Sequence, residues 1–221
     1  MHRLNGVRNV LFDLDGTLVD SRGTILASIA HALESMGLDP AAGPAVDRLI
    51  GRPLLDIFTA SYGMGRERAQ RAIDIYRAYY DALNQEGTRV YDGVREGLAE
   101  LAGGGYSLYV ATVKPTPIAE KVLADLDLRI HFSGVAGATM GPERRGKTAI
   151  IAHALQRFGL APAQSLMIGD RDQDIDGARE NGLRSLGVTW GFGSREELDD
   201  AAPDHLAERF RDIPQLLFGR G

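Results

Sequence analysis

The chain has 221 residues, 44% of them hydrophobic and 25% charged, which is enough apolar material for a large folded domain. Its net charge of −5 and pI near 5.6 argue against a nucleic-acid groove or a membrane-surface patch, and the absence of cysteine excludes thiol catalysis, disulfides and cysteine-ligated metals. Because no apolar run approaches the roughly 20 residues of a transmembrane helix and the acidic turn at Asp13 comes too early for a signal peptide, we expect a cytoplasmic protein with no nucleic-acid or membrane partner.

Short apolar runs alternate along the chain with longer segments of helical periodicity. Five runs have the length and flanking turn residues of strands, at residues 10–12, 107–111, 135–136, 165–168 and 185–188. Four segments have the periodicity of helices, at residues 94–102, 116–126, 147–158 and 172–181. This alternation predicts an α/β fold, a Rossmann-like doubly wound parallel sheet with helices on both faces.

Between the first two of these strands the sequence carries only helix signals. Apolar residues recur at helical spacing from Ile25 to Met36, with Gly37 placed to end that helix, and again across residues 66–83. We expect residues 19–88 to form a small all-helical cap domain, inserted into a catalytic core of residues 1–18 and 89–221. Ligands of such sheets bind at the carboxyl ends of the strands, so an insertion there would serve as a lid.

Polar residues follow the ends of four predicted strands. They are Asp13 and Asp15, Thr112, Lys147, and Asp170 and Asp174. A single acid, threonine or lysine in such a place is usually a helix cap or a solvated residue, but several converging on one edge indicate a site. Carboxylates that approach one another raise each other's pKa unless a cation lies between them, and all-oxygen donors suit Mg²⁺ better than Zn²⁺.

Two other patterns compete for these residues. "GPERRGKT", residues 141–148, matches the Walker A pattern of a nucleotide-binding P-loop, but it is crowded with charged side chains and leaves Asp13, Asp15 and Thr112 without roles. A phospho-receiver module also gathers acids, a threonine and a lysine on a parallel sheet, but it is much shorter and has no helical insertion. An EF-hand starting at Asp170 is excluded, because its sixth position is Ile175 rather than glycine.

Four stretches, "DLDGTLVDS", "VATVKP", "RRGKT" and "MIGDRDQDIDGARENG", resemble the ordered motifs of the haloacid dehalogenase superfamily. Together with the tail "LGVTWGFGSREELDDAAPDHL", they are similar to its phosphoglycolate phosphatase and 5′-nucleotidase-like branch, which carries a helical cap after the first motif. The resemblance covers nearly the whole chain. It implies a Mg²⁺-dependent hydrolase that releases phosphate from a small phosphorylated metabolite.

The resemblance also implies a role for each motif. Asp13 would be the nucleophile that forms an aspartyl-phosphate, and Asp15 would act as the acid and then the base. Mg²⁺ would be held by Asp13, the Asp15 backbone carbonyl and Asp170, with Asp174 holding a bound water or the surrounding shell. Phosphoryl oxygens would be bound by Thr112 and the Val113 amide, and their charge neutralised by Lys147.

The remaining candidates are substrate contacts. They are Gly16 and Thr17 in the first motif, Val113 and Lys114 in the second, and Arg52 in the insertion. Val113 departs from the pattern, because many relatives carry asparagine there. A β-phosphoglucomutase-like isomerase uses the same aspartate pair, but the stretch "GRPLLD" lacks the Ser-Arg pattern of those relatives. The oligomeric state cannot be read from the sequence.

Overall fold

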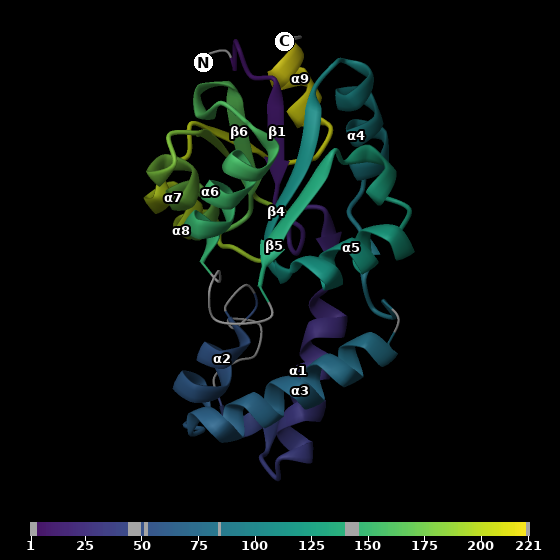
Figure 1. Ribbon diagram of the computed structural model, residues 1–221, viewed down its shortest axis with the longest axis vertical. Coiled ribbons are helices and arrows are strands. Elements are labelled where there is room, and N and C mark those ends of the chain that lie inside the picture. Colours follow the sequence, from purple (N-terminus) through teal and green to yellow (C-terminus); the bar gives the residue numbers. More distant parts are fainter. Residues whose placement is uncertain (1–3, 44–49, 51–52, 84, 140–145, 220–221) are drawn as a thin grey trace. The chain divides into compact units, whose positions relative to one another are not determined.

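The computed structural model describes residues 4–43, 50, 53–83, 85–139 and 146–219 (Figure 1). Its main sheet has six strands in the order β5-β4-β1-β6-β7-β8, and each adjacent pair is parallel. The strands are β1 (Asn9–Phe12), β4 (Ser107–Pro115), β5 (Gly134–Ala138), β6 (Ser165–Gly169), β7 (Arg184–Val188) and β8 (His205–Ala207). The predicted α/β fold with a parallel sheet is confirmed.

Helices cover both faces of the sheet. In Figure 1, α6, α7 and α8 lie on one side of it, and α4, α5 and α9 lie on the other. Their bounds are α4 (Val94–Gly103), α5 (Thr116–Asp125), α6 (Lys147–Phe158), α7 (Asp172–Glu180), α8 (Arg195–Ala201) and α9 (Asp212–Phe218). The four helices expected from periodicity therefore form within one residue of their predicted ends.

Alternate residues of the central strands build two cores. Leu11 and Met167 belong to a buried cluster with Ile150 and Ile151 of α6. Phe12 points to the opposite face, where its ring stacks on Phe210 with centroids 5.9 Å apart and meets the edge of Phe132. Burial on both faces explains why these strands read as continuous apolar runs rather than as an alternation.

Several short strands and helices were not predicted from the sequence. Two short strands at the two ends of the helical insertion were not predicted: β2 (Val19–Asp20) pairs with β3 (Arg89–Val90) in a separate two-stranded sheet. The strand β8 and the helices α8 and α9 were also not predicted. Elements of two, three and seven residues are too short to show a period of their own.

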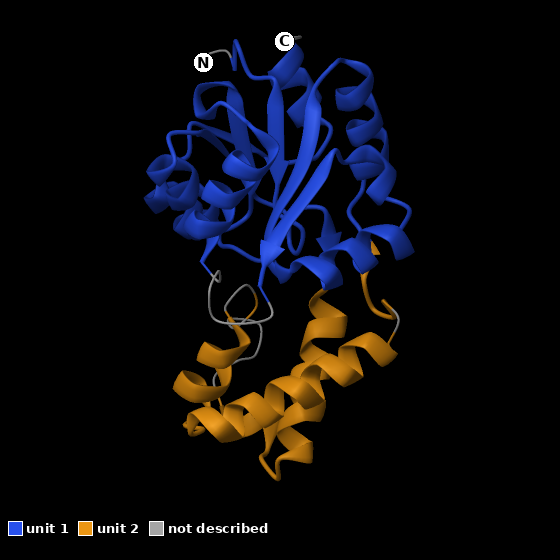
Figure 2. Ribbon diagram, viewed as in Figure 1, with its two compact units in different colours: residues 1–20, 90–221 blue, residues 21–89 orange. Residues whose placement is uncertain are grey.

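The chain divides into two compact units (Figure 2). One comprises residues 1–20 and 90–221, and the other comprises residues 21–89. The second unit contains α1 (Arg22–Ser35), α2 (Leu54–Asp56), a π-helical turn (Ile57–Ser61) and α3 (Arg66–Ala82). Its role as a lid stays a prediction. No helix among the described residues is long and apolar enough to cross a membrane.

In the second unit, α1 and α3 pack against each other. Ile29 and Leu33 of α1 are fully buried, as are Ala69 and Ala72 of α3. The α1 helix gives way to Gly37, whose φ of +73° favours glycine, as its predicted stop requires. The buried residues of α1 and α3 therefore follow the helical spacing of apolar residues in the sequence.

The aromatic stack beneath β1 is the first test of this fold. Replacing Phe12, which is fully buried, by alanine should lower the free energy of unfolding by about 3–5 kcal/mol, because it removes both ring contacts and leaves a cavity. Trp190 is the sole tryptophan, and its ring centroid lies 6.2 Å from that of Phe210. Its fluorescence therefore reports the unfolding in urea of the first unit, residues 1–20 and 90–221. The control is Ile130→Ala at an 84% exposed side chain, which should change stability by less than about 0.5 kcal/mol. Equal effects from the two substitutions would contradict the packing described.

Candidate active site

Asp13 lies immediately beyond β1, at the carboxyl edge of the sheet. Its amide donates to the carbonyl of Ile168 at 2.9 Å, which keeps the residue in line with the strand. The side chain is 5% exposed, and its Oδ1 atom lies 2.8 Å from the Lys147 ammonium. Because parallel strands end at the same edge, this buried carboxylate meets residues that follow β5 and β6.

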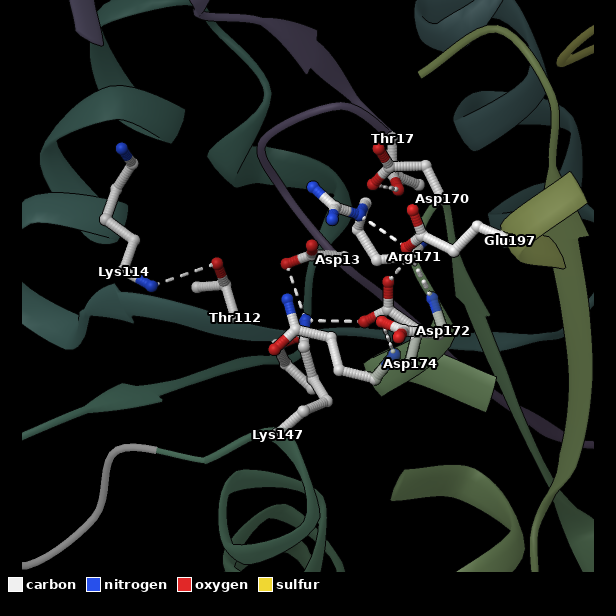
Figure 3. A network of polar contacts seen from close by, with 12 residues as sticks. Asp13, Thr17, Thr112, Lys114, Lys147, Asp170, Arg171, Asp172, Asp174 and Glu197 are labelled. Atoms are coloured by element: carbon white, nitrogen blue, oxygen red, sulfur yellow. Dashed lines mark hydrogen bonds and ion pairs between the residues drawn. The ribbon is translucent and has the colours of Figure 1, made fainter. Parts of the chain in front are cut away.

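Lys147, the first residue of α6, bridges two of these carboxylates (Figure 3). Its Nζ atom lies 2.7 Å from Oδ1 of Asp174 and donates to the Ala111 carbonyl at 3.0 Å. Burial alone would lower the pKa of this lysine, but the charges of Asp13 and Asp174 outweigh it and raise the pKa. Lys147 is therefore a fixed cation between the two acids.

Three buried carboxylates form a candidate metal centre. Ligand oxygens of Asp13, Asp170 and Asp174 all lie within 4.8 Å of one another. Burial, followed by repulsion from Asp174 and Asp13, raises the pKa of Asp170 to about 8. Burial also raises the pKa of Asp174 to about 6, although Lys147 opposes that rise.

The donor set fits Mg²⁺. All three donors are carboxylate oxygens, the ligands that a hard divalent ion prefers. When the three acids are ionised, Lys147 cancels one of three negative charges, and a divalent cation would cancel the other two. Such an ion would favour the ionised forms of Asp170 and Asp174, against the burial and the repulsion that raise their pKa values.

A loop after β7 holds Asp170 in place. The amides of Phe192 and Gly193 donate to its Oδ2 atom at 2.7 and 3.3 Å, and Thr17 donates its hydroxyl to Oδ1 at 3.3 Å. The Trp190 indole donates to the Thr17 carbonyl at 3.1 Å, so the loop also holds the turn after β1. These contacts fix the second carboxylate of the centre.

Arg171 and Glu197 support the third carboxylate. The Arg171 amide donates to Oδ2 of Asp174 at 3.1 Å, and the Arg171 guanidinium lies 2.6 Å from Oε1 of Glu197. The same glutamate oxygen accepts the Asp172 amide at 3.0 Å. Burial would raise the pKa of Glu197, but the hydrogen bonds from Arg171 and the Asp172 amide outweigh it and lower the pKa.

The supporting role of the loop 189–194, Arg171 and Glu197 was not predicted from the sequence. The glycine-rich "WGFGS" after the predicted strand at residues 185–188 was a usable signal, since it follows a strand end like the aspartates do. The Arg171–Glu197 pair left no such signal, because its members are 26 residues apart in sequence.

Asp15 takes part in a second ion pair, distinct from that of Asp13. Its Oδ2 atom lies 2.9 Å from the Lys114 ammonium, and the two side chains are 12% and 7% exposed. Thr112 is fully buried, and its hydroxyl accepts the Lys114 amide at 3.2 Å. The Val113 side chain packs against the hydrophobic cluster beneath α6.

The other predicted site residues differ in where they lie. Gly16 has a φ of +89°, and a Cβ atom there would lie 2.3 Å from Oδ2 of Asp170, so only glycine fits. Thr17 was expected to contact substrate, but it is fully buried and directs its hydroxyl to Asp170. Arg52 and residues 141–145 of the Walker-like stretch lie outside the described residues.

Proton and metal binding should compete at this centre. Because the pKa of Asp170 rises from 3.8 to about 8 on folding, the folded chain keeps a proton that the unfolded chain loses. The stability of the metal-free protein should therefore fall as the pH rises from about 4 to about 8. Added Mg²⁺ should raise the melting temperature more at pH 8 than at pH 6, since it binds the ionised acids. In Asp170→Asn this pH-dependent increment should vanish, whereas an increment that is the same at both pH values would contradict the assignment.

The glycines of the supporting loop should be essential for metal binding. A Cβ atom on Gly191 would lie 2.3 Å from the Asp170 Cβ atom and 2.5 Å from the Gly16 carbonyl. Gly191→Ala should therefore displace Asp170 and weaken Mg²⁺ binding roughly 10–100-fold in isothermal titration calorimetry. Gly103→Ala in α4 is the matched control, because a Cβ atom there meets nothing within 4 Å. Equal Mg²⁺ affinities for both variants would refute this role of the loop.

Comparison with protein families places the chain among known enzymes. Residues 10–188 match the family model described as haloacid dehalogenase-like hydrolase. A 5′-nucleotidase of Pseudomonas aeruginosa is 39% identical over 209 residues, 95% of each chain. A phosphoglycolate phosphatase of Pectobacterium atrosepticum is 32% identical over 226 residues, 98% of this chain and 95% of its own.

The chain is also similar to a bacterial protein kinase and to a solved phosphatase structure. The tyrosine-protein kinase PtkA of Mycobacterium tuberculosis is 37% identical over 190 residues, which are 86% of this chain and 65% of that protein. The crystal structure of a predicted phosphatase from Clostridium acetobutylicum superimposes with a TM-score of 0.89 at 33% identity, covering 96% of this chain and 99% of the other. On the family match and these near full-length relatives, the chain belongs to the haloacid dehalogenase-like hydrolase family.

Proposed function

We propose that the chain is a Mg²⁺-dependent phosphatase that hydrolyses small phosphate monoesters through an aspartyl-phosphate on Asp13. The proposal rests on the groups that surround the Asp13 carboxylate. It is buried at the strand end, 2.8 Å from the Lys147 ammonium, with ligand oxygens of Asp170 and Asp174 within 4.8 Å. A carboxylate between a fixed ammonium and a candidate metal centre is suited to attack an anionic phosphoryl group.

In the first step an oxygen of Asp13 attacks the phosphorus, and the bond from phosphorus to the ester oxygen breaks. The electron pair of that bond stays on the leaving oxygen. Asp15 enters this step protonated and gives its proton to that oxygen, and the carboxylate that remains pairs with Lys114. In the second step a water oxygen attacks the same phosphorus and gives a proton back to Asp15. The bond to Asp13 then breaks, so inorganic phosphate leaves and both aspartates return to their starting states.

In this proposal the phosphoryl group is bound by residues at the carboxyl edge of the sheet. Lys147 offsets the charge of the phosphoryl group, and the Thr112 hydroxyl and Val113 amide donate to its oxygens. Mg²⁺ would be held by Asp13, Asp170, Asp174 and the Asp15 carbonyl. When bound, it brings positive charge that lets the phosphate approach Asp13 and stabilises charge in the transition state.

The names of the relatives guide the choice of substrate. Two of them are a 5′-nucleotidase and a phosphoglycolate phosphatase, so nucleoside 5′-monophosphates and 2-phosphoglycolate are the esters to test first. We propose that residues 21–89, with Arg52, form the cap that selects among such esters. A β-phosphoglucomutase-like isomerase would instead return phosphate to a sugar and release none.

Loss of the nucleophile gives the direct test. Wild-type protein with Mg²⁺ should release phosphate from at least one ester in the panel, and chelation with EDTA should stop the release. Asp13→Asn should lower kcat by at least about a thousandfold, because an amide is a very weak nucleophile towards phosphorus.

Asp176→Asn on α7 is the matched control, because its carboxylate is 52% exposed and pairs with Arg179 on the surface. It should keep wild-type activity. Metal-dependent release that survives Asp13→Asn would refute the covalent mechanism. Conversion of β-glucose 1-phosphate without release of phosphate would support the isomerase instead.

A further inference from the structure

We propose that Lys114 is a positioning residue, which holds the Asp15 carboxylate where it can exchange a proton with the leaving group. The proposal rests on the function proposed above, since it concerns the proton-transfer step of that reaction. It gives Lys114 a task different from the substrate contact that the sequence predicts.

The ion pair between Lys114 and Asp15 is nearly closed to solvent. The Nζ and Oδ2 atoms are 2.9 Å apart, and the side chains are only 7% and 12% exposed. The pair between Lys121 and Asp125 on α5 has a similar distance of 2.7 Å, but its side chains are 42% and 31% exposed. An exposed pair of this kind restricts its carboxylate little, whereas a buried pair fixes the orientation of both partners.

The backbone of β4 is built to place Lys114 at this point. The register with β5 shifts between Thr112 and Pro115, so the strand departs from regular pairing at Lys114. The Lys114 amide turns back to the Thr112 hydroxyl at 3.2 Å, and the following proline favours an extended conformation at Lys114. Gly137 of β5 permits this path, because a Cβ atom there would lie 2.4 Å from the Lys114 carbonyl.

Each of the two catalytic aspartates pairs with a different lysine. Lys147 pairs with Asp13 and Asp174, on the side of the candidate metal centre, while Lys114 pairs with Asp15. Asp15 is two residues from Asp13, so without a cation of its own its carboxylate would be drawn towards Lys147 and the metal. Lys114 thereby keeps the proton-transferring acid apart from the nucleophile.

The test compares two leaving groups. An alkyl phosphate releases a strongly basic alkoxide that needs a proton, whereas p-nitrophenyl phosphate releases a weak base that leaves without one. Lys114→Met should lower kcat/KM for the alkyl ester about 10–100-fold and for p-nitrophenyl phosphate less than about threefold. The value of kcat/KM is the proper readout, because it covers the steps up to transfer of phosphate to Asp13.

A double substitution separates positioning from a structural effect. If Lys114 acts through Asp15, adding Lys114→Met to Asp15→Asn should lower kcat/KM for the alkyl ester by less than about threefold more. Lys121→Met removes the exposed lysine and should leave both esters at wild-type rates.

Equal losses for the two esters, or losses from Lys114→Met and Asp15→Asn that multiply, would overturn the proposal. The proposal would also be overturned if Lys114→Met had the same ratio of kcat/KM for the two esters as the wild type. Failure of the underlying function is recognised separately, because Asp13→Asn would then still release phosphate from both esters.

Discussion

Repulsion among three buried carboxylates is the constraint on which the rest of the site depends. Asp13, Asp170 and Asp174 are held with ligand oxygens within 4.8 Å, and one ammonium, that of Lys147, lies between two of them. Burial, followed by the charges of Asp174 and Asp13, raises the pKa of Asp170 to about 8, so the metal-free centre retains a proton near neutral pH. Clustered acids of this kind are stable together only when a cation completes them.

The fold holds these groups together against that repulsion. Asp13 and Asp170 follow neighbouring strands, β1 and β6, of a sheet whose pairs are all parallel, and backbone amides of the loop after β7 satisfy Asp170. Glycine is required where chain segments crowd the carboxylates, as at Gly16 and Gly191. The α/β core thus supplies rigid strand ends, and short loops supply the donors.

The meeting of the acids and Lys147 at one edge of the sheet was predictable from the strand ends, and the contacts made by the loop after β7 and by Glu197 were not. The period of the apolar runs predicted the core strands and the helices beneath them, and "DLDGT" and "GDRDQD" predicted the acids at one edge. The loop 189–194 and Glu197 lie some 20 residues beyond Asp170, so no local pattern linked them to it. The partners of two side chains were also not predicted, because Thr17 contacts Asp170 and Lys114 contacts Asp15. Their contact with substrate stays a prediction.

The central claim is that Asp13 carries the phosphoryl group during turnover. Asp15→Asn protein should accumulate the aspartyl-phosphate when given Mg²⁺ and p-nitrophenyl phosphate, because formation of the intermediate needs no acid with this ester but its hydrolysis needs a base. Borohydride reduces an acyl phosphate to an alcohol, so mass spectrometry of the treated protein should find homoserine at position 13. Unmodified aspartate at position 13, in protein that has released a stoichiometric burst of p-nitrophenol, would contradict the claim.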